Sequence, residues 1–207
     1  MQLRIGEIAE VRQGMSRSGR SAGARPGDVA VRLISGNNVQ DDRIVTEGLE
    51  EVLIDLDFLT QKHLLRLGDL VVTGKSTAVK AAHVPEGIGK AVANSTMLVV
   101  RPHDPLLGIY LWWLMTSTQG RSMVESIMVA SATLSSLPPR ALSDLEVPVP
   151  PAHEVRLLAD LIRESERAYW SAREAADIRR GTVRDFIVGK LLDNGRRPAW
   201  EEINDTE

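Results

Sequence analysis

Gly74, Lys75 and Ser76 stand in the order that ends a phosphate-binding loop, so nucleotide chemistry is the first hypothesis that the sequence raises. Such a loop requires four residues between its first glycine and the Gly-Lys pair, and a helix that begins directly after it. Here five residues separate Gly68 from Gly74, and the last four of them are strand formers. The spacing therefore favours a turn between two strands, with a small nucleotide-binding enzyme as the alternative.

Other catalytic constellations are missing from the sequence. There is no cysteine, and the four histidines are scattered without a second ligand at metal-binding spacing. No serine occupies a nucleophile elbow, and no glycine-rich site for S-adenosylmethionine is present. We therefore expect a non-catalytic protein, without a metal site or a cofactor of its own.

Length and composition indicate a folded protein that spans no membrane. The 207 residues, of which 43% are hydrophobic, suffice for one domain of ordinary size and an appendage. The first residues, MQLRIGEIAEVRQG, include acidic side chains where a secretion signal needs an apolar run. No stretch approaches the ~18 consecutive apolar residues of a membrane span. We expect a cytoplasmic location.

Charge is unevenly distributed along the chain, although the net charge of −3 argues against a wholly basic nucleic-acid binder. Residues 1–40 contain six arginines against three acidic residues, and residues 61–101 contain six basic against two acidic residues. The segment between them is acidic. Charge alone leaves two interpretations open, an ordinary solvated surface and the basic face of a nucleic-acid binder.

The first part of the chain, residues 1–106, has the texture of short strands and turns. Runs of β-branched residues such as LVVTGKS and TMLVVRP are separated by glycine, asparagine and proline. Residues 15–28 contain too few apolar side chains to pack, so we expect a surface loop there. Asp104 and Pro105 predict the start of a helix of about three turns, in which we expect Trp112 and Trp113 to lie in the core.

The residues after Pro151 predict one long helix, because charges of both signs alternate with apolar residues over about 40 positions without a proline. Such a helix is roughly 60 Å long. Steps of three and four define an apolar seam, interrupted only by Ser165 and Arg179, that is predicted to pair with a second helix. The seam consists of Val155, Leu158, Ile162, Tyr169, Ala172, Ala176, Val183 and Phe186. A helix folded back onto its own domain is the other interpretation.

Together these patterns predict an α+β fold. A mixed, β-rich domain with short helices is expected over residues 1–150. A long helix of coiled-coil type is expected over residues 151–193, for dimerisation and spacing, and a disordered tail over residues 194–207.

The order of several segments resembles the target recognition domain of the specificity (S) subunit of type I restriction-modification systems. The segments are IGEIAEVRQG, LISGNNVQDDRI, LRLGDLVVTGKSTAVKAAHV, ANSTMLVVRP, IYLWWLMTSTQGRSMVESIM and LSDLEVPVPPAHEVRLLADLI. The resemblance covers roughly residues 3–192, and IRRGTVRDFIVGKLL is similar to the end of the family's long helix. The usual subunit of that family has two such domains and two helices, whereas this chain has one of each.

The resemblance implies a half-size, non-catalytic subunit that binds double-stranded DNA as a homodimer and reads a split, symmetric target. Methyltransferase (M) subunits would bring S-adenosylmethionine, and a restriction (R) subunit, where a system has one, would use ATP. An assembly-only subunit that no longer binds DNA is a further alternative.

Lysines and hydroxyls of the Gly74 turn and arginines of the 15–28 loop would face the DNA in this interpretation. Lysine supplies a point charge for phosphates, and arginine forms bidentate contacts with guanine in the major groove. The candidate DNA-binding residues are Arg12, Arg17, Arg20, Arg25, Lys75, Ser76, Thr77 and Lys80.

Overall fold

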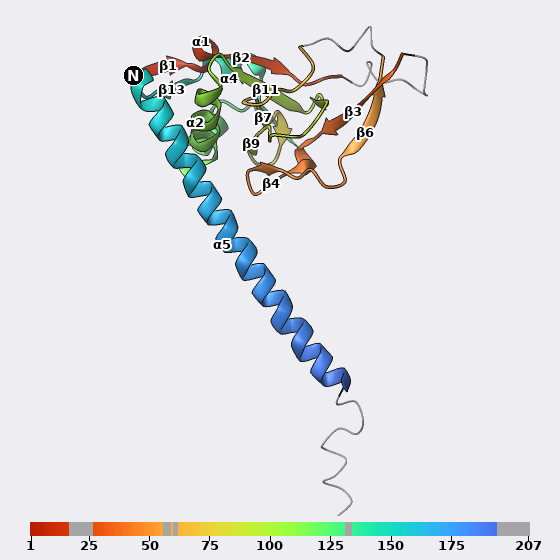
Figure 1. Ribbon diagram of the computed structural model, residues 1–207. Helices are drawn as coiled ribbons and strands as arrows, with labels where there is room; N and C mark the ends of the chain where they lie inside the picture. The colour runs from red at the N-terminus through yellow and green to blue at the C-terminus, as the bar shows by residue number, and fades with distance from the viewer. Residues whose placement is uncertain (17–26, 56–58, 60–61, 131–133, 194–207) are drawn as a thin grey trace, which may run out of the picture. The chain divides into compact units, whose positions relative to one another are not determined.

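The computed structural model describes residues 1–16, 27–55, 59, 62–130 and 134–193 (Figure 1). By its contacts the chain divides into two compact units, Met1–Ile162 and Arg163–Glu207. All strands of the described residues lie in the first unit, together with the short helices. The predicted α+β fold with a long helix after the β-rich domain is confirmed. The predicted tail, residues 194–207, lies outside the described residues.

Two sheets form the framework of the first unit. Their strands are β2 (Ala9–Gln13), β3 (Val29–Ile34), β4 (Val39–Gln40), β5 (Arg43–Ile44), β6 (Glu50–Ile54), β7 (Leu70–Thr73), β9 (Ala81–His83), β10 (Ala91–Ala93) and β11 (Met97–Pro102). The six-stranded sheet has the order β2-β11-β7-β9-β5-β4, antiparallel except between β5 and β9. The three-stranded sheet has the order β10-β3-β6, in which β10 runs parallel to β3.

Two further strand pairs are short. β1 (Gln2–Arg4) runs antiparallel to β13 (Glu146–Pro148), so the first strand of the unit pairs with its last. β8 (Lys75–Ser76) runs antiparallel to β12 (Ser135–Ser136). Neither pairing is evident from the sequence, because both partners are short and far apart along the chain.

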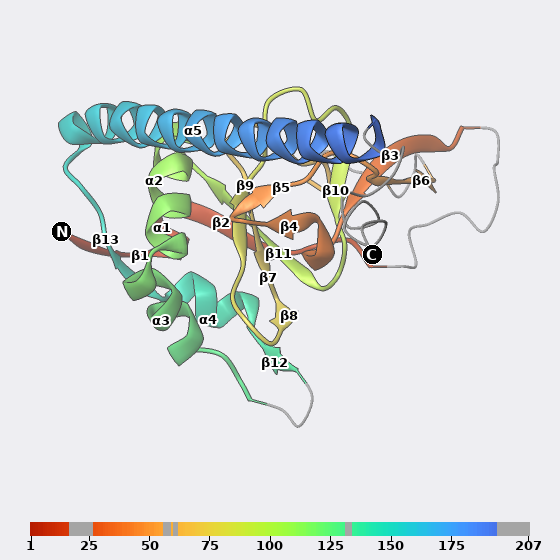
Figure 2. The ribbon, with the colours of Figure 1, turned by 90° about the horizontal axis from the view of Figure 1, so that it is seen from below.

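The core lies on both faces of β7 and β11, whose continuous apolar runs are typical of strands buried on both sides. Leu70, Val72 and Leu98 pack on one face with the helices, and Val71 and Val99 pack on the other face. Figure 2 shows the short helices gathered on one side of the strands. They are α1 (Ile5–Ile8), α2 (Pro105–Thr116), α3 (Thr118–Ser126) and α4 (Pro139–Asp144).

Helices α2 and α3 begin at side-chain caps. The carboxylate of Asp104 accepts a hydrogen bond from the amide of Leu106 at 2.9 Å, and Pro105 occupies the first helical position. The hydroxyl of Ser117 accepts from the amide of Gly120 at 3.0 Å and so caps α3. The predicted start of the first of these helices is confirmed.

The two neighbouring tryptophans of α2 have different environments. Trp112 is buried with Leu111 and Met115, as predicted, and its indole N–H donates to the carbonyl oxygen of Asp42 at 2.8 Å. The prediction for Trp113 is wrong, because this side chain is 48% exposed. Trp113 lies two residues before Met115, which is about 200° around the helix, so it falls on the side of α2 opposite the core.

A buried ion pair ties β11 to the turn before β7. Arg101 donates through Nε and Nη2 to the two carboxylate oxygens of Asp69, at 2.8 and 2.6 Å. The Asp69 side chain is 2% exposed and also accepts from the amide of Arg66 at 2.9 Å. The hydrogen bond to Asp69 raises the pKa of Arg101 above its ordinary value. The pair therefore fixes this turn to the sheet.

Helix α5 runs unbroken from Ala152 to Asp193. Its first turns pack within the first unit, because Val155, Ala159 and Ile162 are all buried there. The assignment of Val155 and Ile162 to the pairing seam is therefore wrong. Over two or three turns, a stripe that packs on a domain has the same spacing as a seam that packs on another helix, so the sequence pattern fits both uses.

The later seam positions of α5 lie in the second unit and are open to a partner. Tyr169, Val183 and Phe186 are each more than half exposed, and Ala172 and Ala176 are also exposed. Pairing through these positions stays a prediction.

Among the described residues, no helix is both long and apolar enough to cross a membrane.

Candidate nucleic-acid interface

The Gly74 turn, by which we mean residues 74–80, begins directly after β7, contains β8 and leads into β9, so no helix directly follows it. The amides of Gly74 and Lys75 both donate to the carbonyl oxygen of Thr96, at 2.8 and 3.2 Å. These amides would have to face the phosphates in a phosphate-binding loop. A Cβ at Gly74 would lie 3.1 Å from the same oxygen and 3.3 Å from Leu98, so close packing explains the glycine. Gly74, Lys75 and Ser76 therefore do not form a nucleotide site.

Hydroxyl groups fix the chain after the Gly74 turn. The buried hydroxyl of Thr73 accepts from the amide of Lys80 at 3.0 Å and lies 3.0 Å from the hydroxyl of Ser76. Ser76 in turn donates to the carbonyl oxygen of Ala78 at 2.6 Å. Ser76 thus stabilises the turn from within, which limits its predicted role as a DNA contact.

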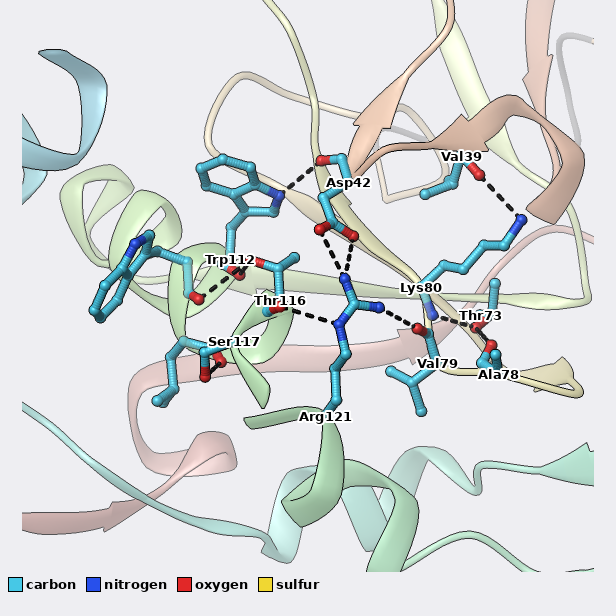
Figure 3. Close-up of polar contacts among 12 residues, drawn as sticks. Val39, Asp42, Thr73, Ala78, Val79, Lys80, Trp112, Thr116, Ser117 and Arg121 are labelled. Carbon is cyan, nitrogen blue, oxygen red and sulfur yellow. Dashed lines mark hydrogen bonds and ion pairs between the residues drawn. The ribbon is translucent and has the colours of Figure 1, made fainter. Parts of the chain in front are cut away.

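Arg121 of α3 holds the same turn from the outside (Figure 3). Its Nη1 donates to the carbonyl oxygen of Val79 at 2.8 Å, and its Nη2 lies 2.6 and 2.7 Å from the carboxylate oxygens of Asp42. Its Nε donates to the carbonyl oxygen of Thr116 at 3.0 Å. One planar guanidinium therefore joins three segments that lie far apart in the sequence.

The partner of Arg121 lies in a tight hairpin between β4 and β5. Asp41 and Asp42 have φ of 47° and 60°, and Gln40 pairs with Arg43 across the turn. A two-residue hairpin turn of type I′ requires positive φ at both central positions, and aspartate tolerates positive φ better than most residues. The turn directs the carboxylate of Asp42 toward the guanidinium of Arg121 (Figure 3).

Replacing Arg121 by lysine should loosen the Gly74 turn, because an ammonium group keeps the charge but cannot reach three acceptors at once. We expect amide hydrogen exchange at Thr73 and Lys80 to accelerate about tenfold, since their hydrogen bonds close the turn. The exposed Arg140→Lys serves as the control. Equal exchange rates in wild type and Arg121→Lys would show that the contacts of Arg121 do not stabilise the turn.

Three of the predicted DNA-binding residues keep an exposed side chain on this turn. Lys75, Thr77 and Lys80 are exposed. The ammonium group of Lys80 also donates to the carbonyl oxygen of Val39 at 3.2 Å, so it lies over β4 (Figure 3). Among the predicted residues that the structure describes, Lys75 and Thr77 are therefore best placed to reach a ligand.

Arg12 does not have the open position that a phosphate contact needs. It is half-buried on β2, and its Nε and Nη2 atoms are buried with no hydrogen-bond partner among the described residues. Burial lowers the pKa of its guanidinium below the ordinary value, and the neighbouring charge of Arg101 lowers it further. The structure therefore places Arg12 beside the Arg101–Asp69 pair. The other predicted arginines, Arg17, Arg20 and Arg25, lie outside the described residues.

Sequence reasoning missed two parts of this region. Arg121 reads as an ordinary surface charge on a short helix, and only its contacts with Val79 and Asp42 reveal its role. Strand β12 has no strand-like sequence, yet it extends the turn by pairing with β8. No local signal predicts either, because both depend on contacts between distant segments.

Comparison with known proteins gives a match in structure alone. No family model matches the chain, and no curated protein matches it in sequence. Among solved structures, the S subunit of a type I restriction-modification system from M. genitalium is 13% identical with a TM-score of 0.56, covering 95% of this chain. The HsdS subunit from Thermoanaerobacter tengcongensis is 15% identical with a TM-score of 0.58, covering 91%.

A third structure comes from work on complex assembly and conformational transition of the type I R-M system. It is 12% identical with a TM-score of 0.59, covering 90% of this chain. This chain spans less than half of each of these three chains, 43% to 46%. The resemblance inferred from the sequence is confirmed in the fold: the described domain and helix have the fold found in type I specificity subunits.

Proposed function

We propose that this chain is a sequence-specific DNA-binding specificity subunit of a type I restriction-modification complex. The observation that carries the proposal is the fold, which is shared with S-subunit structures over at least 90% of the chain. The exposed Lys75 and Thr77, on a turn that is already fixed, support it, because a preorganised cationic turn loses little entropy on binding a phosphate backbone. DNA as the ligand also agrees with the cytoplasmic location expected from the sequence.

In this proposal the chain binds a specific DNA sequence, and its partner subunits catalyse the reactions. Methyltransferase subunits bind S-adenosylmethionine and transfer the methyl group, and a restriction subunit joins them where the system has one. The absence of a nucleophile elbow or a glycine-rich cofactor loop in the sequence supports this division of labour.

We further propose a homodimer formed through α5, which would hold two copies of the domain on a split, symmetric target. The exposed side chains of Tyr169, Val183 and Phe186, with the small residues Ala172 and Ala176 between them, support this. An amphipathic helix with an open apolar stripe is stable in water when a second helix covers the stripe. Helix length would then set the distance between half-sites.

The proposal is tested by sequencing the DNA fragments that the purified chain retains, alone and with its methyltransferase subunits. We expect sequenced fragments to share an interrupted, symmetric motif, and binding to weaken steeply with salt. Unmeasurable duplex binding at low salt, with the dimer and the methyltransferase complex intact, would contradict DNA recognition and favour an assembly-only subunit.

Replacing Lys75 by alanine should weaken binding to all duplexes about equally, since a lysine at a phosphate carries no sequence information. The slope of log Kobs against log salt concentration should fall by about 0.9, the contribution of one phosphate contact. Arg156→Ala, which removes an exposed cation from the first turns of α5, is the matched control. An unchanged slope in fluorescence anisotropy titrations would remove Lys75 from the footprint.

A further inference from the structure

A small ribbon of β-structure projects beside the Gly74 turn. It consists of β8, β12 and Val129, and we call it the β8–β12 ribbon. Ser136 exchanges two backbone hydrogen bonds with Val129, at 2.8 and 2.9 Å, and pairs with Lys75 on its other side. Figure 2 shows β8 and β12 side by side. A segment more than 50 residues later in the sequence thus supplies most of the ribbon.

One face of the ribbon carries a cation, a hydroxyl and two apolar groups. Residues paired across neighbouring strands point to the same face, so Lys75, Ser136 and Val129 form a row. We place Leu134 on the same face, because it lies directly before β12, two residues from Ser136, and side chains of extended chain repeat every two residues. Val129 is 58% exposed and Leu134 is 46% exposed, in contrast to the apolar side chains that are buried in the core of the domain.

The ribbon is also cationic. The ribbon itself contributes Lys75, and the segments 74–80 and 127–138 around it contain no acidic residue, in a chain whose net charge is −3. A surface that combines exposed apolar groups with positive charge and no acidic residue complements a polyanion that also presents apolar groups. Double-stranded DNA has this chemistry, because its phosphates flank the thymine methyl groups in the major groove.

The base of the ribbon is fixed before any ligand binds. The amide of Leu137 donates to the carbonyl oxygen of Gly74 at 2.8 Å, and the amide of Gly74 donates to Thr96. The clamp of Arg121 on Val79 holds the other end of the turn. Because the backbone is already ordered, exposed side chains on the ribbon can specify a base edge at little entropic cost.

We infer that the β8–β12 ribbon enters the major groove and that Val129 and Leu134 contact thymine methyl groups there. The inference rests on the proposed DNA-binding function and names the element that reads the bases. The major groove is about 12 Å wide and admits a two-stranded β-ribbon. The C5-methyl of thymine is the apolar group on its floor, so apolar side chains select A·T pairs, while Lys75 contacts a phosphate.

The test removes either the methyl group or the side chains that contact it. Wild type and the double variant Val129→Ser, Leu134→Ser are titrated by fluorescence anisotropy with the duplex that wild type selects. The same titrations use duplexes in which each thymine of the site is replaced in turn by uracil, which lacks only the methyl group. Both replaced side chains are largely exposed, so the variant should fold as wild type does.

We expect uracil at one or more positions to weaken wild-type binding about fourfold per lost methyl contact, and the double variant to show no such loss. Leu67→Ser, at a leucine that is 66% exposed near the opposite end of β7, should keep the wild-type response. An equal uracil penalty in the double variant, or no penalty in wild type, would overturn the inference while leaving specific DNA binding intact. Failure of wild type to bind any duplex would instead overturn the proposed function.

Discussion

Replacing Asp69 by alanine is expected to lower the free energy of unfolding by about 3–5 kcal/mol, the usual cost of removing one partner from a buried ion pair. The guanidinium of Arg101, only 15% exposed, would lose both of its hydrogen bonds to the carboxylate and stay buried near the second cation, Arg12. The amide of Arg66 would lose its acceptor as well. Urea denaturation should show a lower midpoint with an unchanged m value.

Two further variants separate the ion pair from general damage to the domain. Glu164→Ala breaks the exposed pair with Arg167 and should cost less than about 1 kcal/mol. The double variant Asp69→Leu, Arg101→Met leaves no unpaired charge at either of the two positions, so it should recover much of the stability that Asp69→Ala loses. If the double variant is no more stable than the single one, the loss does not come from the stranded cation.

Replacing Val183 and Phe186 together by aspartate is expected to convert the proposed homodimer into monomers. Both side chains are more than half exposed in one chain, so the substitutions should leave the isolated helix and domain folded. In the dimer they would place four carboxylates in an apolar seam, each at a cost of several kcal/mol. We expect the dissociation constant to rise at least about a thousandfold, measured by light scattering and sedimentation over a range of concentrations.

Val188→Asp offers a matched control on the same helix. Val188 is also about half exposed, but it lies about 140° around the helix from Val183. The mass in solution should therefore not change in this variant. Wild type that is already monomeric at high concentration would contradict pairing through α5, and dissociation by Val188→Asp alone would place the seam on the other side of the helix.

The sequence predicted those parts of the fold that depend on local chemistry. Asp104 and Pro105 marked the start of α2, and the charge alternation after Pro151 marked α5, because caps and helical periodicity involve neighbouring residues only. The burial of Val155 and Ile162 was missed, because a short stripe looks the same whether it packs on a domain or on a second helix. Trp113 was misplaced because α2 contains no charged residue, so no charged face marks the solvent side.

The candidate interface was predicted only in part, for the same reason. The strand formers before Gly74 correctly pointed to a turn between strands in place of a phosphate loop. Arg12 was placed on the interface because a count of charges cannot show that it lies beside Arg101. The role that we propose for Val129 has no signal in the sequence, because it depends on the pairing of Val129 with β12 and of β12 with β8.

Much of the first unit must be synthesised before its first strands, β1 and β2, can pair with their neighbours in the sheets. Leu3 of β1 pairs with Val147 of β13, and Val11 of β2 pairs with Val100 of β11. Loops this long are costly to close, so the nascent chain waits with β2 unpaired and is exposed to chaperones and to aggregation. A chain interrupted before Glu146 should remain insoluble, whereas loss of residues beyond Ile162 should leave a domain that refolds from urea.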